Sequence, residues 1–118
     1  MKALLIDVTK REVREAQFDG LRDLQTLVGG YIEVAYAWEE NGDTLFVDEE
    51  GLLKRGVTEL AAFRIPQRPD QALAGNGVLV GREVEGDEFP TGYIHEDPTM
   101  TVEALTKLVR FVTTRPLP

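Results

Sequence analysis

Three consecutive acidic residues, Asp48, Glu49 and Glu50, precede a glycine and form the densest group of side chains that could do chemistry. Acidic residues followed by glycine resemble part of a calcium-binding loop. The spacing excludes an EF-hand, because the first and last ligand positions of that loop would fall on Phe46 and Val57. We therefore expect a solvated turn without a metal ion, whose carboxylates are candidates for binding a small molecule or for use by an enzyme.

His95 is the only histidine, and Glu96 and Asp97 follow it directly. A carboxylate can orient an imidazole for proton transfer, which would make His95 a general base. Neighbours in sequence rarely face one another, however, and the chain contains no serine or cysteine that could act as a nucleophile. We assign no catalytic residue, interpret His95 as an exposed loop histidine and keep it as a binding candidate. The sequence favours a protein that is not an enzyme.

The connection between residues 66 and 77 is rich in proline and glycine and is longer than most loops in compact domains. We regard it as the best candidate for a functional loop, with Arg68 on a lid over the carboxylates at 48–50. The glycines of this region precede and end a strand expected at 78–80, whereas a dinucleotide-binding loop opens a helix. No cofactor is expected.

The acidic composition argues against direct nucleic-acid binding. The 118 residues include 21 acidic and 13 basic side chains, and the formal net charge of -8 would repel phosphate backbones. The same charge keeps a small domain soluble, which is the simpler explanation. The sequence has no apolar segment long enough to span a membrane or serve as a signal sequence, and no cysteine. We expect a cytoplasmic protein without membrane contact.

The clearest structural pattern covers residues 31–53, which we predict to form a β-hairpin. Alternating apolar residues indicate a strand with one buried face, and Asn41-Gly42 offers two positions that tolerate positive φ, as a type I′ turn requires. Pairing outward from that turn places Trp38 opposite Leu45. We expect Trp38 to be buried between the hairpin and the C-terminal helix.

Periodicity and capping residues predict the remaining elements. The first strand is apolar on both faces, so it belongs inside a sheet. Strands are expected at 1–7, 12–18 and 78–80, and a turn at Gly86-Asp87. Helices are expected from the capping residue Asp19 to Gly29-Gly30, within 56–65 after Thr58, and from Thr101 to Val112.

The fold class that we predict is α+β, with a mainly antiparallel sheet of four to five strands and two or three helices on one face. Length and composition predict a single globular domain over residues 1–118, with a frayed tail from about residue 114.

Four segments carry a resemblance to a known family. MKALLID, DLQTLVGGYIEV, LFVDEEGLL and GNGVLVG occur in this order over most of the chain. Together they resemble a family of small uncharacterised proteins, a domain of unknown function found in bacteriophages, mobile elements and bacteria. The resemblance implies a genetic setting but supplies no catalytic or binding residues.

These observations favour a small, acidic, non-enzymatic binding module that acts on a protein partner, which the resemblance suggests is a host protein. One alternative is a small-molecule binder or enzyme that uses the carboxylates at 48–50. A second alternative is an acidic mimic of DNA. The sequence identifies neither the partner nor the oligomeric state, and it is compatible with a homodimer.

Overall fold

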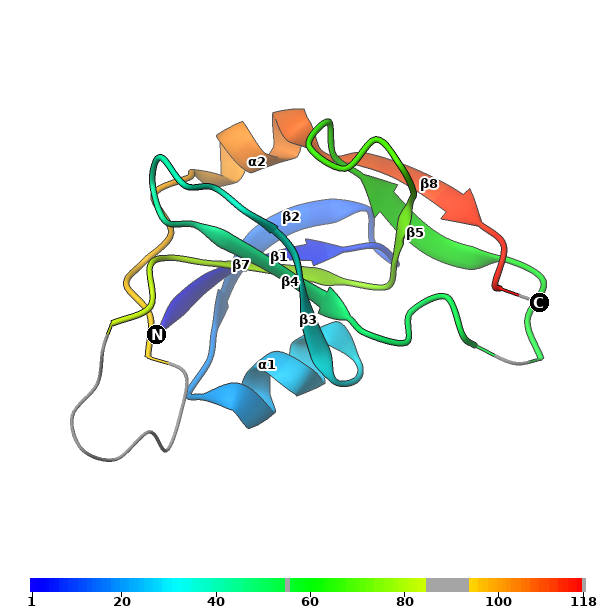
Figure 1. Cartoon of the computed structure of the whole chain (residues 1–118), viewed down its shortest axis with the longest axis horizontal. Coiled ribbons are helices and arrows are strands. Elements are labelled where there is room, and N and C mark those ends of the chain that lie inside the picture. The colour runs from blue at the N-terminus through cyan, green and yellow to red at the C-terminus, as the bar shows by residue number, and fades with distance from the viewer. Residues whose placement is uncertain (55, 85–93, 118) are drawn as a thin grey trace.

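The computed structural model describes residues 1–54, 56–84 and 94–117, and Figure 1 shows how its elements are arranged. The turn expected at Gly86-Asp87 lies outside the described residues. In chain order the elements are β1 Lys2–Asp7, β2 Glu12–Gln17, α1 Leu21–Val28, β3 Ile32–Ala37, β4 Thr44–Asp48, β5 Leu60–Arg64, β6 Leu73–Ala74, β7 Gly77–Val80, α2 Val102–Leu108 and β8 Arg110–Thr114. Within those described ranges, neither helix is long or apolar enough to cross a membrane.

A five-stranded antiparallel sheet in the order β2-β1-β7-β4-β3 forms the middle layer. Leu24 and Val28 of α1 pack on one of its faces. Leu105 of α2 and Phe63 of the three-stranded sheet β6-β5-β8 pack on the other face, so α1 and α2 lie on opposite sides in Figure 1. The fold is a mixed α+β fold, as predicted. The predicted antiparallel sheet of four to five strands is confirmed. The prediction of helices on one face was wrong, and the three-stranded sheet was not predicted.

The apolar pattern of β1 explains why both faces of the large sheet are covered. Leu4 pairs with Leu79, which pairs with Leu45, and this row faces α2 and the small sheet. The neighbouring row, which includes Leu5 and Val78, faces α1. Side chains alternate between the faces of a strand, so a covering layer on one side alone would leave one of the two rows in water.

The helix α1 begins and ends at glycines. Its N-cap is Gly20, which supplies no side-chain cap, so the prediction that Asp19 caps the helix was wrong. The N–H of Asp19 instead donates to the carboxylate of Asp23 at 2.7 Å. At the other end Gly29 adopts the left-handed conformation, with φ 92°, and its N–H donates to the carbonyl of Gln25. The predicted stop at Gly29 is confirmed.

The hairpin of β3 and β4 forms as predicted, but its register differs from the predicted one. Tyr36 pairs with Leu45, and a β-bulge between Val34 and Tyr36 shifts the ladder by one residue. Trp38 lies opposite Asp43, to whose carbonyl its N–H donates at 2.8 Å. The connection is therefore longer than the two residues of a type I′ turn.

The turn of this hairpin depends on one glycine. Gly42 has a φ of 81°, and its N–H donates to the carbonyl of Trp38 at 2.8 Å. Asn41 has no positive φ and contributes its side chain, which accepts the N–H of Asp43 at 2.9 Å. The type I′ assignment was wrong because Asn41 forms this local hydrogen bond in place of the left-handed conformation.

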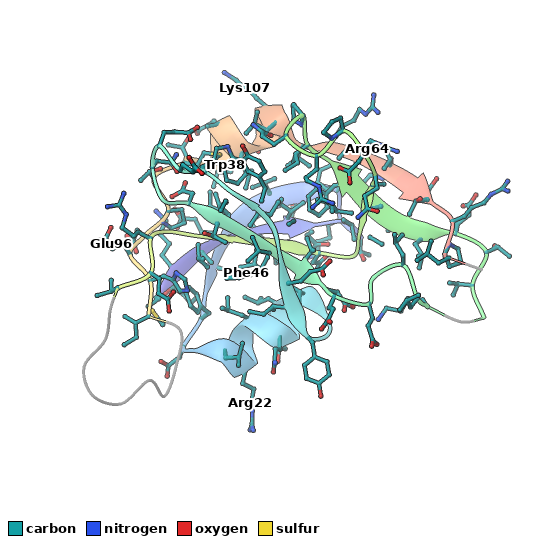
Figure 2. The ribbon with its side chains drawn as sticks, viewed as in Figure 1. Arg22, Trp38, Phe46, Arg64, Glu96 and Lys107 are labelled. Atoms are coloured by element: carbon teal, nitrogen blue, oxygen red, sulfur yellow. The ribbon has the colours of Figure 1, made fainter. Side chains whose placement is uncertain are left out.

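Trp38 is buried in the core that includes Leu105 of α2, as predicted, and 5% of its surface is exposed. Its ring makes an edge contact with Tyr36 at a centroid distance of 4.8 Å. Figure 2 labels Trp38 on the side of the sheet where α2 lies.

Two segments that we expected to be helical are strands. The segment expected as a helix within 56–65 contains β5, and the helix expected to reach Val112 ends at Leu108, where β8 follows. Phe63 of β5 pairs with Phe111 of β8, and Ala62 pairs with Val112. Each segment forms strand hydrogen bonds with a partner about 50 residues away, which outweighs a weak local helical pattern.

Phe63 joins the two sheets. Its side chain is fully buried, and its ring lies over Gly77 in the centre of the large sheet. A Cβ atom built on Gly77 would lie 2.7 Å from Cζ of Phe63 and 3.2 Å from Cδ1 of Ile6. The ring therefore occupies the space that a side chain at position 77 would need. At the far end of the small sheet, the N–H of Leu117 donates to the carbonyl of Leu52 at 2.7 Å.

We predict that Gly77→Ala destabilises the domain by about 1–3 kcal/mol, because the added methyl group overpacks the contact with Phe63. Phe63→Leu in the same chain should recover part of that loss, since the shorter side chain vacates the space. Urea unfolding of both single variants and the double variant measures the coupling. Strictly additive losses would contradict the contact.

We also predict that Gly42→Ala costs about 1–2 kcal/mol, because a side chain disfavours the left-handed conformation. Asn41→Ala is the comparison, and it should cost less, about 0.5–1.5 kcal/mol, since it removes one hydrogen bond. Thermal unfolding of the two variants gives the order. Equal losses would mean that both positions carry the turn.

Candidate functional site

Asp48 ends β4 and anchors the turn that follows it. One carboxylate oxygen accepts the N–H of Glu50 at 2.9 Å, and the other lies 3.0 Å from Nζ of Lys54. Only 5% of the Asp48 side chain is exposed, against 47% for Lys54. The carboxylate is thus neutralised and bonded within the protein, while the side chains of Glu49 and Glu50 are exposed. The solvated turn expected here is confirmed for the two glutamates.

Two shallow hollows lie on either side of Asp48. One has a volume of about 210 Å³, and β6 and the residues before it form one wall. The second, of about 310 Å³, lies between the end of α1 and Lys54. Both depend on glycines, because a Cβ atom on Gly30 would lie 2.6 Å from Oδ1 of Asp48 and one on Gly51 would lie 2.6 Å from the carbonyl oxygen of Ala74.

Exposed apolar side chains surround these hollows. Tyr31 is 69% exposed, and Leu53 and Leu117 are each 55% exposed. Tyr31 lines the second hollow, and both leucines line the first. We call this region the Asp48 surface, which consists of Tyr31, Glu33, Asp48, Glu49, Glu50, Leu53 and Leu117.

Arg68 holds its own loop against β3. Its Nε and Nη2 donate to the two carboxylate oxygens of Asp70 at 3.0 and 3.1 Å, and its Nη1 donates to the carbonyl of Ala35 at 2.8 Å. The hydrogen bond with Asp70 raises the pKa of Arg68, and the same bond lowers the pKa of Asp70. Arg68 lines neither hollow beside Asp48. The part of this loop that does reach the first hollow is residues 71–72, next to β6.

His95 lies in a buried position, which contradicts the expectation of an exposed loop histidine. It is 7% exposed, and its ring centroid is 6.2 Å from those of Phe18 and Phe46. Nδ1 is 2.9 Å from the carbonyl oxygen of Gly81, so it is the nitrogen that donates. His95 lines neither hollow beside Asp48. The structure therefore brings together the three acidic candidates but neither Arg68 nor His95.

Asp43 has the most buried carboxylate in the described part of the chain, and the sequence reading assigned it no role. The side chain is fully buried. Its oxygens accept the N–H of Thr99 at 2.9 Å, the hydroxyl of Thr99 at 3.0 Å and the N–H of Met100 at 3.0 Å. This residue fixes the segment that leads into α2. Its neighbours in sequence gave no signal of such a role, because all three donors lie more than 50 residues away.

Comparison with protein families identifies the family of the chain. A model of a domain of unknown function, DUF3846, matches residues 1–96. The chain belongs to the DUF3846 family. Neither the curated proteins nor the solved structures include one that matches it. The DUF3846 match covers the Asp48 surface except for Leu117, and it ends before α2 and β8.

The sequence patterns did not identify a second group of side chains in this DUF3846 protein. Arg64 and Arg110 are direct partners across β5 and β8, and together with Arg68 they line a groove of about 400 Å³. Both strands had been expected to be helices, so no sequence signal placed the two arginines opposite one another. Within the described residues, no three His, Asp or Glu side chains form a group that could hold a metal ion.

We predict that Asp43→Asn destabilises the protein by about 2–3 kcal/mol, because its amide group cannot accept all three hydrogen bonds in a buried site. Glu40→Gln, in the exposed turn of the same hairpin, is the matched control and should be neutral. Urea unfolding measures both. Equal stability of the two variants would show that the segment before α2 is held without Asp43.

Proposed function

We propose that this protein is a non-enzymatic binding module that acts on a protein partner through the Asp48 surface. The observation that carries the proposal is the group of exposed apolar side chains beside two hollows with an acidic rim. Following the resemblance stated above, the setting that we propose is a phage or mobile element, with the partner a host protein in the cytoplasm.

The apolar side chains give the surface its binding energy. Tyr31, Leu53 and Leu117 expose more than half of their surface to water. Tyrosine is enriched among the residues that contribute most of the energy of an interface, and burial of leucine side chains adds the hydrophobic contribution of the area removed from water. Hollows of about 210 and 310 Å³ can each accept one side chain of the partner. The proposed contact is therefore two partner side chains inserted on either side of Asp48.

The charge of the rim selects the partner. Glu33 and Glu49 line the first hollow, and Glu50 lines the second. Lys54 neutralises Asp48, so the three glutamates leave a net negative rim. Complementary charge favours a partner segment that combines lysine or arginine with apolar side chains.

The same geometry supports an enzyme less well. A catalytic carboxylate must reach a substrate, but both oxygens of Asp48 are bonded to Glu50 and Lys54. Binding of a small molecule in the hollows is the alternative that their volumes favour. Mimicry of DNA by the acidic surface is the remaining alternative and rests on the net charge of -8 alone.

The test compares capture of host proteins by the wild type and by a Tyr31→Ser/Leu53→Ser variant. We expect one stoichiometric partner, whose basic segment binds the wild type and binds the variant at least tenfold more weakly by titration calorimetry. Val57→Ser is the matched control, because Val57 is 45% exposed and lies outside both hollows.

Failure to recover a stoichiometric partner would contradict the proposal, as would a partner that binds the double variant as tightly as the wild type. Sedimentation of the isolated protein provides the third readout. A dimer that the double variant abolishes would identify the occupant of the Asp48 surface as a second copy of the chain instead of a host protein.

A further inference from the structure

The groove at the end of the small sheet concentrates positive charge on an acidic protein. Arg64, Arg68 and Arg110 supply three of its seven lining residues. The other four are apolar or proline: Ile65, Pro66, Pro69 and Leu108. The groove has a volume of about 400 Å³ and lies between β5, the loop after it and the junction of α2 with β8. In Figure 2 Arg64 is labelled near α2, on the opposite side of the sheet from Arg22 on α1.

Arg64 and Arg110 bring two like charges together across the small sheet. They are direct partners across two antiparallel strands, and side chains of such partners project from the same face. Within the residues that the structure describes, neither forms an ion pair. Like charges placed directly opposite destabilise a sheet. An anion bound between the two guanidinium groups would remove that repulsion.

Arg68 is held in place at the same groove. Its hydrogen bonds to Asp70 and to the carbonyl of Ala35 use three of the five N–H groups of a guanidinium. Two N–H groups remain for a ligand. Within the described residues Asp70 forms an ion pair with Arg68 alone, although its charge also interacts with that of Arg64. The groove thus combines one guanidinium that is held by hydrogen bonds with two that form no ion pair in the described part of the chain.

The chemistry of the groove indicates its ligand. Three guanidinium groups match the oxygens of a phosphate, which accept paired hydrogen bonds from arginine. The net charge of -8 would repel an extended polyanion such as DNA, whereas a compact anion interacts mainly with the charges within about 8 Å. Leu108, which is only partly buried, can contact an organic group attached to the phosphate.

We propose that the groove lined by Arg64, Arg68 and Arg110 is a binding site for a small phosphate-bearing molecule. The site is separate from the Asp48 surface, with which it shares no lining residue. Inorganic phosphate and an organic phosphomonoester share the anionic group, and the apolar wall favours the phosphomonoester.

Nuclear magnetic resonance titration of the full chain tests the site. The probes are inorganic phosphate, phenyl phosphate and phenylacetate, added at constant ionic strength with chloride as the reference. We expect both phosphates to shift the amide signals of residues 64–68 and 108–110, and phenyl phosphate to bind more tightly. Phenylacetate should bind at least tenfold more weakly than phenyl phosphate, because its single negative charge and two oxygens engage fewer guanidinium groups.

Arg64→Gln and Arg110→Gln should each weaken binding of phenyl phosphate by at least tenfold. In the absence of ligand they should unfold at the same or a higher temperature than the wild type, since the cross-strand repulsion is removed. Arg22→Gln is the matched control, because it removes the same charge from the exposed face of α1.

Tighter binding of phenyl phosphate than of inorganic phosphate supports an organic ligand, and equal binding supports free phosphate. The proposal is overturned if neither phosphate shifts the groove signals, if phenylacetate binds as tightly as phenyl phosphate, or if Arg22→Gln weakens binding as much as Arg64→Gln. Unlike the capture experiment, these measurements need no protein partner, so the two proposals can fail separately.

Discussion

The insertion of the Phe63 ring over Gly77 is the contact on which the rest of the structure depends. It joins the small sheet to the centre of the large one, where a side chain at position 77 of β7 would exclude the ring. The small sheet that this ring anchors borders both candidate sites. Arg64 follows Phe63 directly, and β6, which pairs with β5, forms a wall of the first hollow beside Asp48.

The parts of the fold that could be predicted are those whose signals are local. The two-sided apolar pattern of β1 and the left-handed Gly29 specify their own structure, because periodicity and a glycine conformation involve only neighbours. The stretch around Phe63 and the end of the C-terminal segment could not be assigned in this way. Their strand state comes from pairing with one another across roughly 50 residues, and single-sequence periodicity does not register such pairing.

The candidate site was only partly predictable for a related reason. Acidic residues in sequence look alike, but their roles here differ with burial. The oxygens of Asp48 and Asp43 accept hydrogen bonds from backbone, lysine and threonine donors within the fold, whereas the side chains of Glu49 and Glu50 are exposed to water. Sequence spacing located the acidic turn correctly. It could not show which carboxylates remain available, because that depends on donors supplied by the tertiary structure.

The hydrogen bond from Arg68 to Ala35 has a consequence for how the protein behaves at high concentration. β3 is an edge strand of the large sheet, and edge strands expose backbone groups on which another chain can add a strand and begin aggregation. At this edge the bulge interrupts the regular spacing, and the Arg68 guanidinium occupies the carbonyl of Ala35. At the β3 edge a charged side chain from the loop after β5 thus occupies a carbonyl that an intruding strand would need, whereas β2 forms the other edge of the sheet.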